Sequence, residues 1–303
     1  MLKIISECRV QPFGKPWMQQ LPSDDESDGI GMNFDGQDTG LDYYPCTYGK
    51  SRTMFRGPRV SLDGPYTVVI GSCEVYGRYV EDPFTDQLAE RTGRRVVNLG
   101  VINGGIDTFV KDEAIMQIIG GAETVVIQAM GAQNLSNRYY TVHPRRNDRF
   151  LKHSTTMTNL YRDVDFSDFS FTRHMLSSLR EVSQNRFRIL QLELEIAWVA
   201  RMTVLLSRIK GNRILLWIED ETDRGLGAEP LFVTVDMMQQ LEASLDKIVH
   251  CNVTDAMTDA QTAQMVVPQA DLARANQFLT PAAHERVAEN LVRAVRRVDG
   301  MAA

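Results

Sequence analysis

Residues 67–78 read TVVIGSCEVYGR. The first four residues are β-branched, and Gly71 separates them from a segment with helical character. A buried strand that enters a tight glycine turn and then a helix often holds a reactive side chain at the edge of a sheet. The stretch therefore predicts an α/β fold with Ser72 or Cys73 as a nucleophile. The alternative is a strand end with two small residues, one of them a buried cysteine.

Five segments, this one included, are short, β-branched and apolar at consecutive positions. This pattern is typical of strands that helices cover on both faces, and helical periodicity separates the segments. The alternation predicts a doubly wound parallel sheet. The predicted strands are 66–70, 95–99, 124–129, 213–218 and 247–253. The predicted helices are 84–92, 110–119, 184–209, 235–245 and one that starts with a Thr280 cap followed by Pro281.

The 303 residues are enough for one large α/β domain, which we expect over 41–303. Residues 1–40 are expected to be a disordered leader, because LPSDDESDGIG is acidic and offers little to bury. Residues 41–65 are expected to pack as an irregular arm. Residues 136–180 form a polar insertion with little periodicity, which should overhang the edge where the parallel strands end, the carboxyl edge of the sheet.

Composition limits the classes of partner. The net charge of −6 disfavours nucleic acid and anionic membrane surfaces, since both require a basic face. Four cysteines lack CxxC spacing, so neither a metal site nor a disulfide framework is indicated. No stretch approaches the roughly 20 apolar residues of a membrane span, and no signal peptide is visible. We expect a cytoplasmic protein, and its oligomeric state stays open.

Short polar blocks follow the first three predicted strands. They are Gly71-Ser72-Cys73, then NLGVINGG at 98–105, then GAQN at 131–134. This arrangement resembles the SGNH (GDSL-type) hydrolase superfamily, whose blocks are Gly-Asp-Ser, Asn-x-Gly-x-x-Gly and Gly-x-Asn-Asp. The resemblance covers roughly 66–135 and 275–297. It implies a flavodoxin-like three-layer α/β/α sandwich with about five parallel strands. It also implies an esterase or acyltransferase activity on a small-molecule or carbohydrate substrate.

The blocks depart from that pattern. Cys73 occupies the serine nucleophile position, as in a capsule-polysaccharide-biosynthesis family of candidate acetyltransferases whose block begins Gly-Asn-Cys. Asn103 takes the second-block glycine position in strict register, and Gly104 takes it with a one-residue shift. By this resemblance the oxyanion hole combines the backbone N–H groups of Cys73 and Gly104 with an amide from Gln133 or Asn134. Such donors meet charge that develops in the transition state.

The catalytic base is the weak part of this resemblance. The segment QFLTPAAHERVAENL resembles the closing Asp-x-x-His-x-x-Pro-x-x-His segment, but Phe278 and Ala275 stand at the histidine and aspartate positions. His284 then matches a second, usually structural, histidine. Two replacement bases are considered, His143 and His284, with packing or capping roles as the alternatives. A thiol needs its base less than a hydroxyl does, because it ionises closer to neutral pH.

Four arginines, Arg138, Arg145, Arg146 and Arg149, follow the third block. A dense arginine cluster in an acidic protein suggests recognition of phosphate, sulfate or carboxylate. It would suit an anionic sugar or the phosphates of an acyl-CoA donor; no cofactor is otherwise indicated. The alternative is structural pairing with the nearby aspartates Asp148, Asp163, Asp165 and Asp168.

The sequence thus supports two hypotheses. One is an esterase or acyltransferase with Cys73 as nucleophile, acting on an acylated carbohydrate-like or anionic substrate. The other is a catalytically inactive protein of the same fold that binds an anionic ligand through its arginine-rich loop. A histidine nitrogen beside the Cys73 sulfur would favour the first hypothesis, and a buried sulfur with no histidine near it would favour the second.

Overall fold

The computed structural model describes residues 40–300, so the predicted leader lies outside the described residues, except for its last position. The centre is a parallel five-stranded sheet in the order β2-β1-β3-β6-β7. Its strands are β1 (Thr67–Gly71), β2 (Val96–Gly100), β3 (Thr124–Gln128), β6 (Asn212–Glu219) and β7 (Lys247–Asn252). This order defines a flavodoxin-like sandwich, so the predicted fold class is confirmed.

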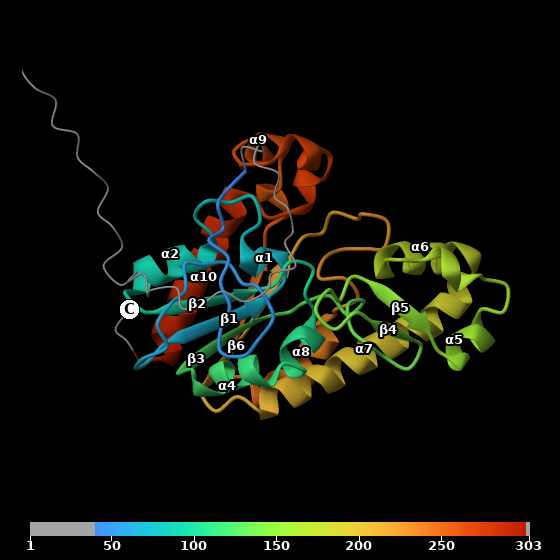
Figure 1. The fold of residues 1–303 in the computed structure, drawn as a ribbon, viewed down its shortest axis with the longest axis horizontal. Helices are drawn as coiled ribbons and strands as arrows, with labels where there is room; N and C mark the ends of the chain where they lie inside the picture. Colours follow the sequence, from blue (N-terminus) through green and yellow to red (C-terminus); the bar gives the residue numbers. More distant parts are fainter. Residues whose placement is uncertain (1–39, 301–303) are drawn as a thin grey trace, which may run out of the picture.

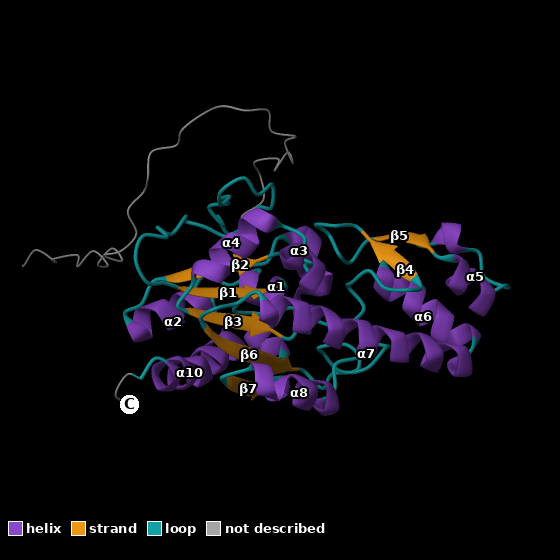
Figure 2. Cartoon of the chain, turned by 90° about the horizontal axis from the view of Figure 1, so that it is seen from below, coloured by secondary structure: helices purple, strands orange, loops and turns teal. Residues whose placement is uncertain are grey.

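Helices cover both faces of the sheet (Figures 1 and 2). Val68 and Ile70 of β1 belong to the larger apolar core, whereas Val69 between them belongs to the second core. This alternation follows from the pleat of a strand. The larger core includes α3 (Ile106–Val110), α4 (Glu113–Gly121), α7 (Gln184–Ser207) and α8 (Val235–Leu241). The second includes α2 (Phe84–Thr92) and α10 (Pro281–Val298).

The helix predicted at 110–119 starts later, at Glu113, as α4, and α3 precedes it as a separate helix that was not predicted. The Asp112 carboxylate accepts hydrogen bonds from the backbone N–H groups of Ala114 and Ile115, at 3.1 and 3.2 Å. A side chain that caps a helix in this way starts a new one. The short elements after α8 are the 3-10 turns η2 (Glu242–Ser244), η3 (Thr254–Ala256) and η4 (Gln269–Gln277), and the helix α9 (Asp259–Thr262).

The insertion is more regular than its weak periodicity suggested. An antiparallel hairpin, β4 (Tyr140–Val142) and β5 (Phe150–His153), precedes α5 (Thr155–Leu160), η1 (Phe166–Asp168) and α6 (Thr172–Val182). Their buried side chains join the larger core beside the first half of α7. The hydrophobic spacing within the insertion itself gave only a weak signal for these elements. The insertion forms a lobe beyond one end of the sheet (Figure 1, right). This is the carboxyl edge, where the sequence placed it.

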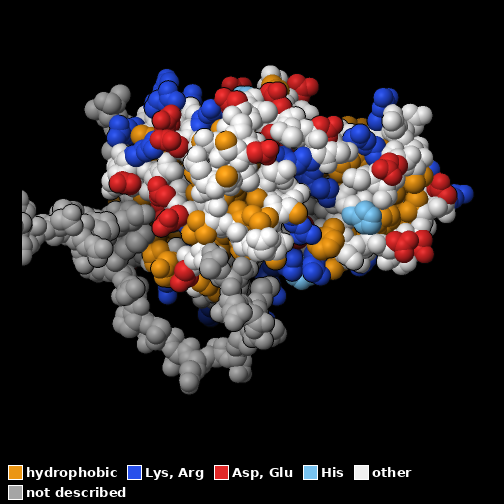
Figure 3. All heavy atoms as spheres, turned by 90° about the horizontal axis from the view of Figure 1, so that it is seen from above, with side chains coloured by type: hydrophobic (Ala, Val, Ile, Leu, Met, Phe, Trp, Pro, Cys, Tyr) orange, Lys and Arg blue, Asp and Glu red, His pale blue; other side chains and the backbone are white. Residues whose placement is uncertain are grey.

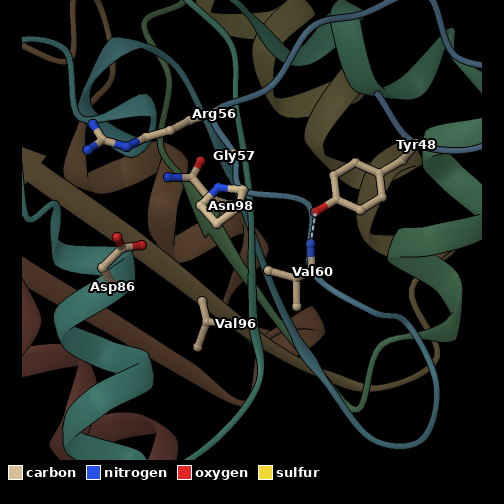
Figure 4. Close-up of a pocket in the computed structure, with 8 residues that line it drawn as sticks. Tyr48, Arg56, Gly57, Val60, Asp86, Val96 and Asn98 are labelled. Carbon is tan, nitrogen blue, oxygen red and sulfur yellow. Dashed lines mark hydrogen bonds between the residues drawn. The ribbon is translucent and has the colours of Figure 1, made fainter. Parts of the chain in front are cut away.

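The arm at 41–65 is irregular apart from one bridge between Cys46 and Phe55. Arg56 anchors it: the guanidinium donates hydrogen bonds to the backbone carbonyls of Tyr76, Gly77, Val80 and Glu81 at 2.7–3.3 Å. A cavity of about 10 Å³ lies beside it, and Asp86 and Asn98 contribute to its lining (Figure 4). That volume holds at most one water molecule. Arg56 therefore ties the arm to residues 76–81.

Within residues 40–300, no helix combines the length and the apolar character needed to cross a membrane. Cys46, Cys73 and Cys251 are free thiols. The same part of the chain holds no group of three histidine, cysteine or acidic side chains placed to bind a metal ion.

Candidate functional site

Two glycines place Cys73 at the carboxyl edge. A Cβ atom on Gly71 would lie 2.2 Å from Gln128 Oε1, and one on Gly100 would lie 2.2 Å from the backbone nitrogen of Tyr76. Both distances are far shorter than any normal contact, so only glycine fits. The short helix α1 (Cys73–Tyr76) can therefore lie directly against the ends of β1 and β2.

Cys73 is 8% exposed, and Asn103 makes two hydrogen bonds with its sulfur. The thiol donates to Asn103 Oδ1 at 3.3 Å, and the backbone N–H of Asn103 donates to the sulfur at 3.2 Å. Asn103 has a φ of 55°, a left-handed conformation that asparagine tolerates better than most residues.

Asn103 also connects Cys73 to the insertion through its side-chain amide. Asn103 Nδ2 donates to Asp148 Oδ2 at 3.1 Å. Burial raises the pKa of Asp148, and the nearby charges of Arg146 and Arg149 act in the opposite direction. Cys73, Asn103 and Asp148 thus form a connected polar chain from the sheet to the loop at 143–149.

The Cys73 sulfur is present as a thiol rather than a thiolate. Burial raises the pKa of Cys73 to about 12, with the carboxylate of Glu74 as the second cause. The Asn103 N–H and the Arg78 charge lower this pKa, but by less. Since the thiolate is the nucleophile, Cys73 is poorly reactive in this environment.

His143 uses its ring within its own loop. Its Nδ1 accepts hydrogen bonds from the backbone N–H groups of Arg145 and Arg146, at 3.3 and 3.1 Å. Its backbone carbonyl accepts from Asn147 Nδ2 at 2.8 Å, and Asn147 Oδ1 in turn accepts from the N–H of Gly105. The residue therefore shapes the 143–149 loop and holds it against the loop after β2.

His284 is a core residue at the start of α10. It is 1% exposed, its Nδ1 accepts from the backbone N–H of Phe84 at 3.1 Å, and its ring stacks on that of Phe84. Burial lowers its pKa to about 3, with Arg56 as a second cause, so the ring is neutral. Among the described residues, no histidine nitrogen is a hydrogen-bond partner of the Cys73 sulfur. The structure does not bring either predicted base to the predicted nucleophile.

Gly104 and Asn134, two of the predicted oxyanion-hole residues, make hydrogen bonds with groups other than the Cys73 sulfur. The Gly104 N–H closes a turn onto the carbonyl of Val101 at 2.9 Å, so Asn103 rather than Gly104 presents its N–H to the sulfur. Asn134 Oδ1 accepts from the Thr172 hydroxyl at 2.9 Å. Gln133 is 6% exposed and its Oε1 has no hydrogen-bond partner within the described residues. The backbone N–H that donates to the sulfur is that of Asn103, the residue that strict register placed at the second-block glycine position.

An aromatic and charged cluster surrounds the position where the resemblance expects a catalytic histidine. The Phe278 ring packs edge-on against Tyr79, and the Arg78 guanidinium lies 4.8 Å from the Phe278 centroid. Asp271 accepts from the Tyr79 hydroxyl at 2.5 Å and pairs with Arg78 at 3.2 Å. Ala275 is buried. The cluster fastens η4 to the end of α1 and supplies no base.

The four arginines differ in their partners. Arg138 pairs with Glu193 at 2.8 Å. Arg145, Arg146 and Arg149 form no ion pair with a carboxylate of residues 40–300, and Arg149 lies over the ring of Phe171. Of the predicted competing aspartates, Asp163 pairs with Arg186, Asp165 caps η1 and Asp148 accepts from Asn103. The charges of Arg146 and Arg149 act on Asp148 electrostatically, without forming an ion pair.

The surface view agrees with this distribution. Lys and Arg side chains gather beside a hollow between the body of the molecule and the insertion lobe (Figure 3). Besides the small cavity near Arg56, a cavity of about 340 Å³ lies at the opposite, amino-terminal edge of the sheet, beside Asn212 and Lys247. Neither of these two cavities is lined by Cys73.

Sequence reasoning missed Asn103 and Asp148 as partners of Cys73. Asn103 entered the argument only as a replacement for a glycine, and Asp148 only as a competitor for the arginines. A signal was available for Asn103, because asparagine before two glycines favours a left-handed turn. No local signal pairs Asp148 with a residue 45 positions earlier.

The comparison with protein families gave one match. A family model with the description "Domain of unknown function (DUF6473)" covers residues 32–299, nearly the whole chain. A search of curated proteins found no match.

Proposed function

The chain belongs to the DUF6473 family, and we propose that this member binds a small anionic ligand at the carboxyl edge of its sheet. The observation that carries the proposal is the set of three arginines on the 143–149 loop, Arg145, Arg146 and Arg149. None of them forms an ion pair with a carboxylate of the described residues, although the charge of Asp148 lies near Arg146 and Arg149. Guanidinium groups bind phosphate, sulfate and carboxylate in a planar, two-point geometry. A cytoplasmic anion or acidic carbohydrate fits this site.

The loop is held firmly enough to preorganise the arginines. His143 Nδ1 fixes the backbone at Arg145 and Arg146, Asn147 is fully buried, and the Arg149 backbone pairs with Phe171. A loop that is already ordered loses less conformational entropy when it binds a ligand. The acidic net charge of the protein makes this local positive site more selective for a small anion than for nucleic acid.

The first prediction concerns anion binding. The variant Arg145→Gln/Arg146→Gln/Arg149→Gln is expected to bind sulfate and phosphate at least about tenfold more weakly than wild type, because charge-assisted hydrogen bonds are lost. Isothermal titration calorimetry at low ionic strength measures the affinity. The matched control is Arg162→Gln/Arg188→Gln/Arg274→Gln, which removes the same charge from exposed positions elsewhere. Equal affinity of the two triple variants would contradict the proposal.

Acyl transfer through Cys73 is the second candidate function. The observation in its favour is the Asn103 N–H at 3.2 Å from the sulfur, a donor beside the point where an acyl oxygen would develop charge. In this case an acyl-CoA or acylated carbohydrate would be the substrate. The raised pKa of Cys73 and the separate roles of His143 and His284 argue against it.

The second prediction separates the two functions. If anion binding is the function, wild type and Cys73→Ala are expected to hydrolyse p-nitrophenyl acetate at the same slow rate, because the thiol lacks a base. Absorbance of released nitrophenolate measures the rate. A loss of activity in Cys73→Ala and also in His143→Ala would instead establish acyl transfer, since His143 otherwise only supports the loop.

A further inference from the structure

The hydrogen bonds around Asn103 define which way its side-chain amide points. Asp148 Oδ2 lies 3.1 Å from one end of the amide, and the Cys73 sulfur lies 3.3 Å from the other. A carboxylate can only accept hydrogen bonds, so the end that faces Asp148 must be the NH₂ group. The carbonyl oxygen must then face the sulfur, where it accepts from the thiol.

This orientation favours the protonated sulfur. A carbonyl oxygen stabilises an S–H donor and repels the lone pairs of a thiolate, whereas an NH₂ group would stabilise the thiolate. The backbone N–H of Asn103 already donates to the sulfur at 3.2 Å. If the amide turned around, the sulfur would receive two donors from the same residue.

We propose that Asp148 is a positioning residue: its carboxylate fixes the Asn103 amide with the oxygen toward Cys73 and so keeps Cys73 as an unreactive thiol. The proposal goes beyond anion binding, because it assigns the Asn103 and Asp148 side chains a role that needs no ligand. It also accounts for a cysteine at a nucleophile position that is chemically silent. A partner from the insertion thus adds to the effects of burial and Glu74, which already favour the thiol.

Other charges near these groups act independently of the amide. Glu74 and Arg78, from α1 and the turn after it, face Cys73 with opposite effects on its pKa. Arg146 and Arg149 face Asp148 and favour its carboxylate form. Removal of the Asp148 charge therefore changes the field of the two arginines as well as the amide, and the experiment has to separate these effects.

The experiment measures alkylation of folded protein by iodoacetamide, with the rate at each cysteine determined by mass spectrometry. In Asp148→Asn the new amide can donate to Asn103, so the Asn103 side chain is free to turn its NH₂ group toward the sulfur. Cys73 alkylation is expected to become about tenfold faster at pH 8, equivalent to a pKa lower by about one unit. Buried Cys251 serves as an internal control and should keep its rate.

The Asn103→Gly variant separates the effect of the Asn103 amide from the effect of the arginine charges. Glycine tolerates the left-handed backbone and keeps the N–H that donates to the sulfur, but it has no amide to orient. In this background Asp148→Asn is expected to change the Cys73 rate by less than about threefold, because only the field of the arginines is then altered. Hydrogen exchange of the 143–149 loop is expected to stay unchanged.

Three results would overturn the proposal. One is an equal rate of Cys73 alkylation in wild type, Asp148→Asn, Asn103→Gly and the double variant, which includes the case of no labelling in any of them. Another is an acceleration by Asp148→Asn that is as large in the Asn103→Gly background as in wild type. The third is faster hydrogen exchange of the loop by the same factor as the alkylation, since Asp148 would then act only by holding the loop closed.

Discussion

Acidification from pH 7 to pH 4 is expected to lower the free energy of unfolding by about 3 kcal/mol through His284 alone. The ring is buried and neutral, and its pKa in the folded protein is about 3, against an ordinary value of 6.5. It accepts a hydrogen bond from the Phe84 N–H, a role that a doubly protonated imidazolium cannot fill.

The direction of the effect follows from proton binding. Between pH 6.5 and 3 the unfolded chain binds a proton at His284 and the folded protein does not. The stabilising contribution of the neutral ring is therefore complete above pH 6.5 and is lost progressively as the pH falls toward 3. This is the behaviour of a structural histidine, whereas a general base would titrate close to neutral pH.

Urea unfolding at several pH values between 7 and 4 measures the effect. The control is His284→Gln, whose amide oxygen can still accept a hydrogen bond but does not titrate. The variant is expected to be less stable at pH 7 and to show a shallower loss of stability on acidification. The interpretation fails if both proteins lose stability equally, because the loss would then come from carboxylates elsewhere.

Arg56→Met is expected to destabilise the protein by about 3–5 kcal/mol. The Arg56 side chain is 8% exposed, and burial lowers the pKa of its guanidinium. It nevertheless binds four backbone carbonyls between residues 76 and 81. Methionine keeps the length of the apolar stem but leaves these carbonyls without their donor. The segment they belong to follows Cys73 directly, so its order depends on the arm.

The free energy of unfolding in guanidinium chloride tests this prediction. Arg52→Met is the matched control, because Arg52 is an exposed arginine on the same arm. The control is expected to change stability by less than about 0.5 kcal/mol. A similar small effect of Arg56→Met would show that the carbonyls find other partners and that the arm is not anchored by this residue.

The fold was predictable because its signals are local. Consecutive apolar residues such as Val68, Val69 and Ile70 pack into both cores, and this double burial is what the β-branched runs indicate. The insertion was not predicted in detail, because its short helices bury few residues each and depend on α7 for a core. The cap at Asp112 starts α4 at Glu113, later than the start at residue 110 that periodicity alone indicated.

The candidate site was predictable only in part. The sequence placed Cys73, the block after β2 and the insertion at the same edge, since strand order and loop position follow from the α/β pattern. It could not show which side chains meet there. Asn103 and Asp148 are 45 residues apart and join through tertiary packing. His143 and His284 are plausible bases in sequence, yet their ring nitrogens accept backbone hydrogen bonds elsewhere.

The most direct test of the central claim is the NMR response of individual arginine side chains to inorganic phosphate. The guanidinium resonances of Arg145, Arg146 and Arg149 are expected to shift with a common, saturable dependence on phosphate concentration. Those of the exposed arginines Arg162, Arg188 and Arg274 are expected to show no saturable shift. Two results would contradict the account of an anion site at the carboxyl edge. Either both sets of arginines respond equally, or only arginines outside the 143–149 loop show a saturable shift.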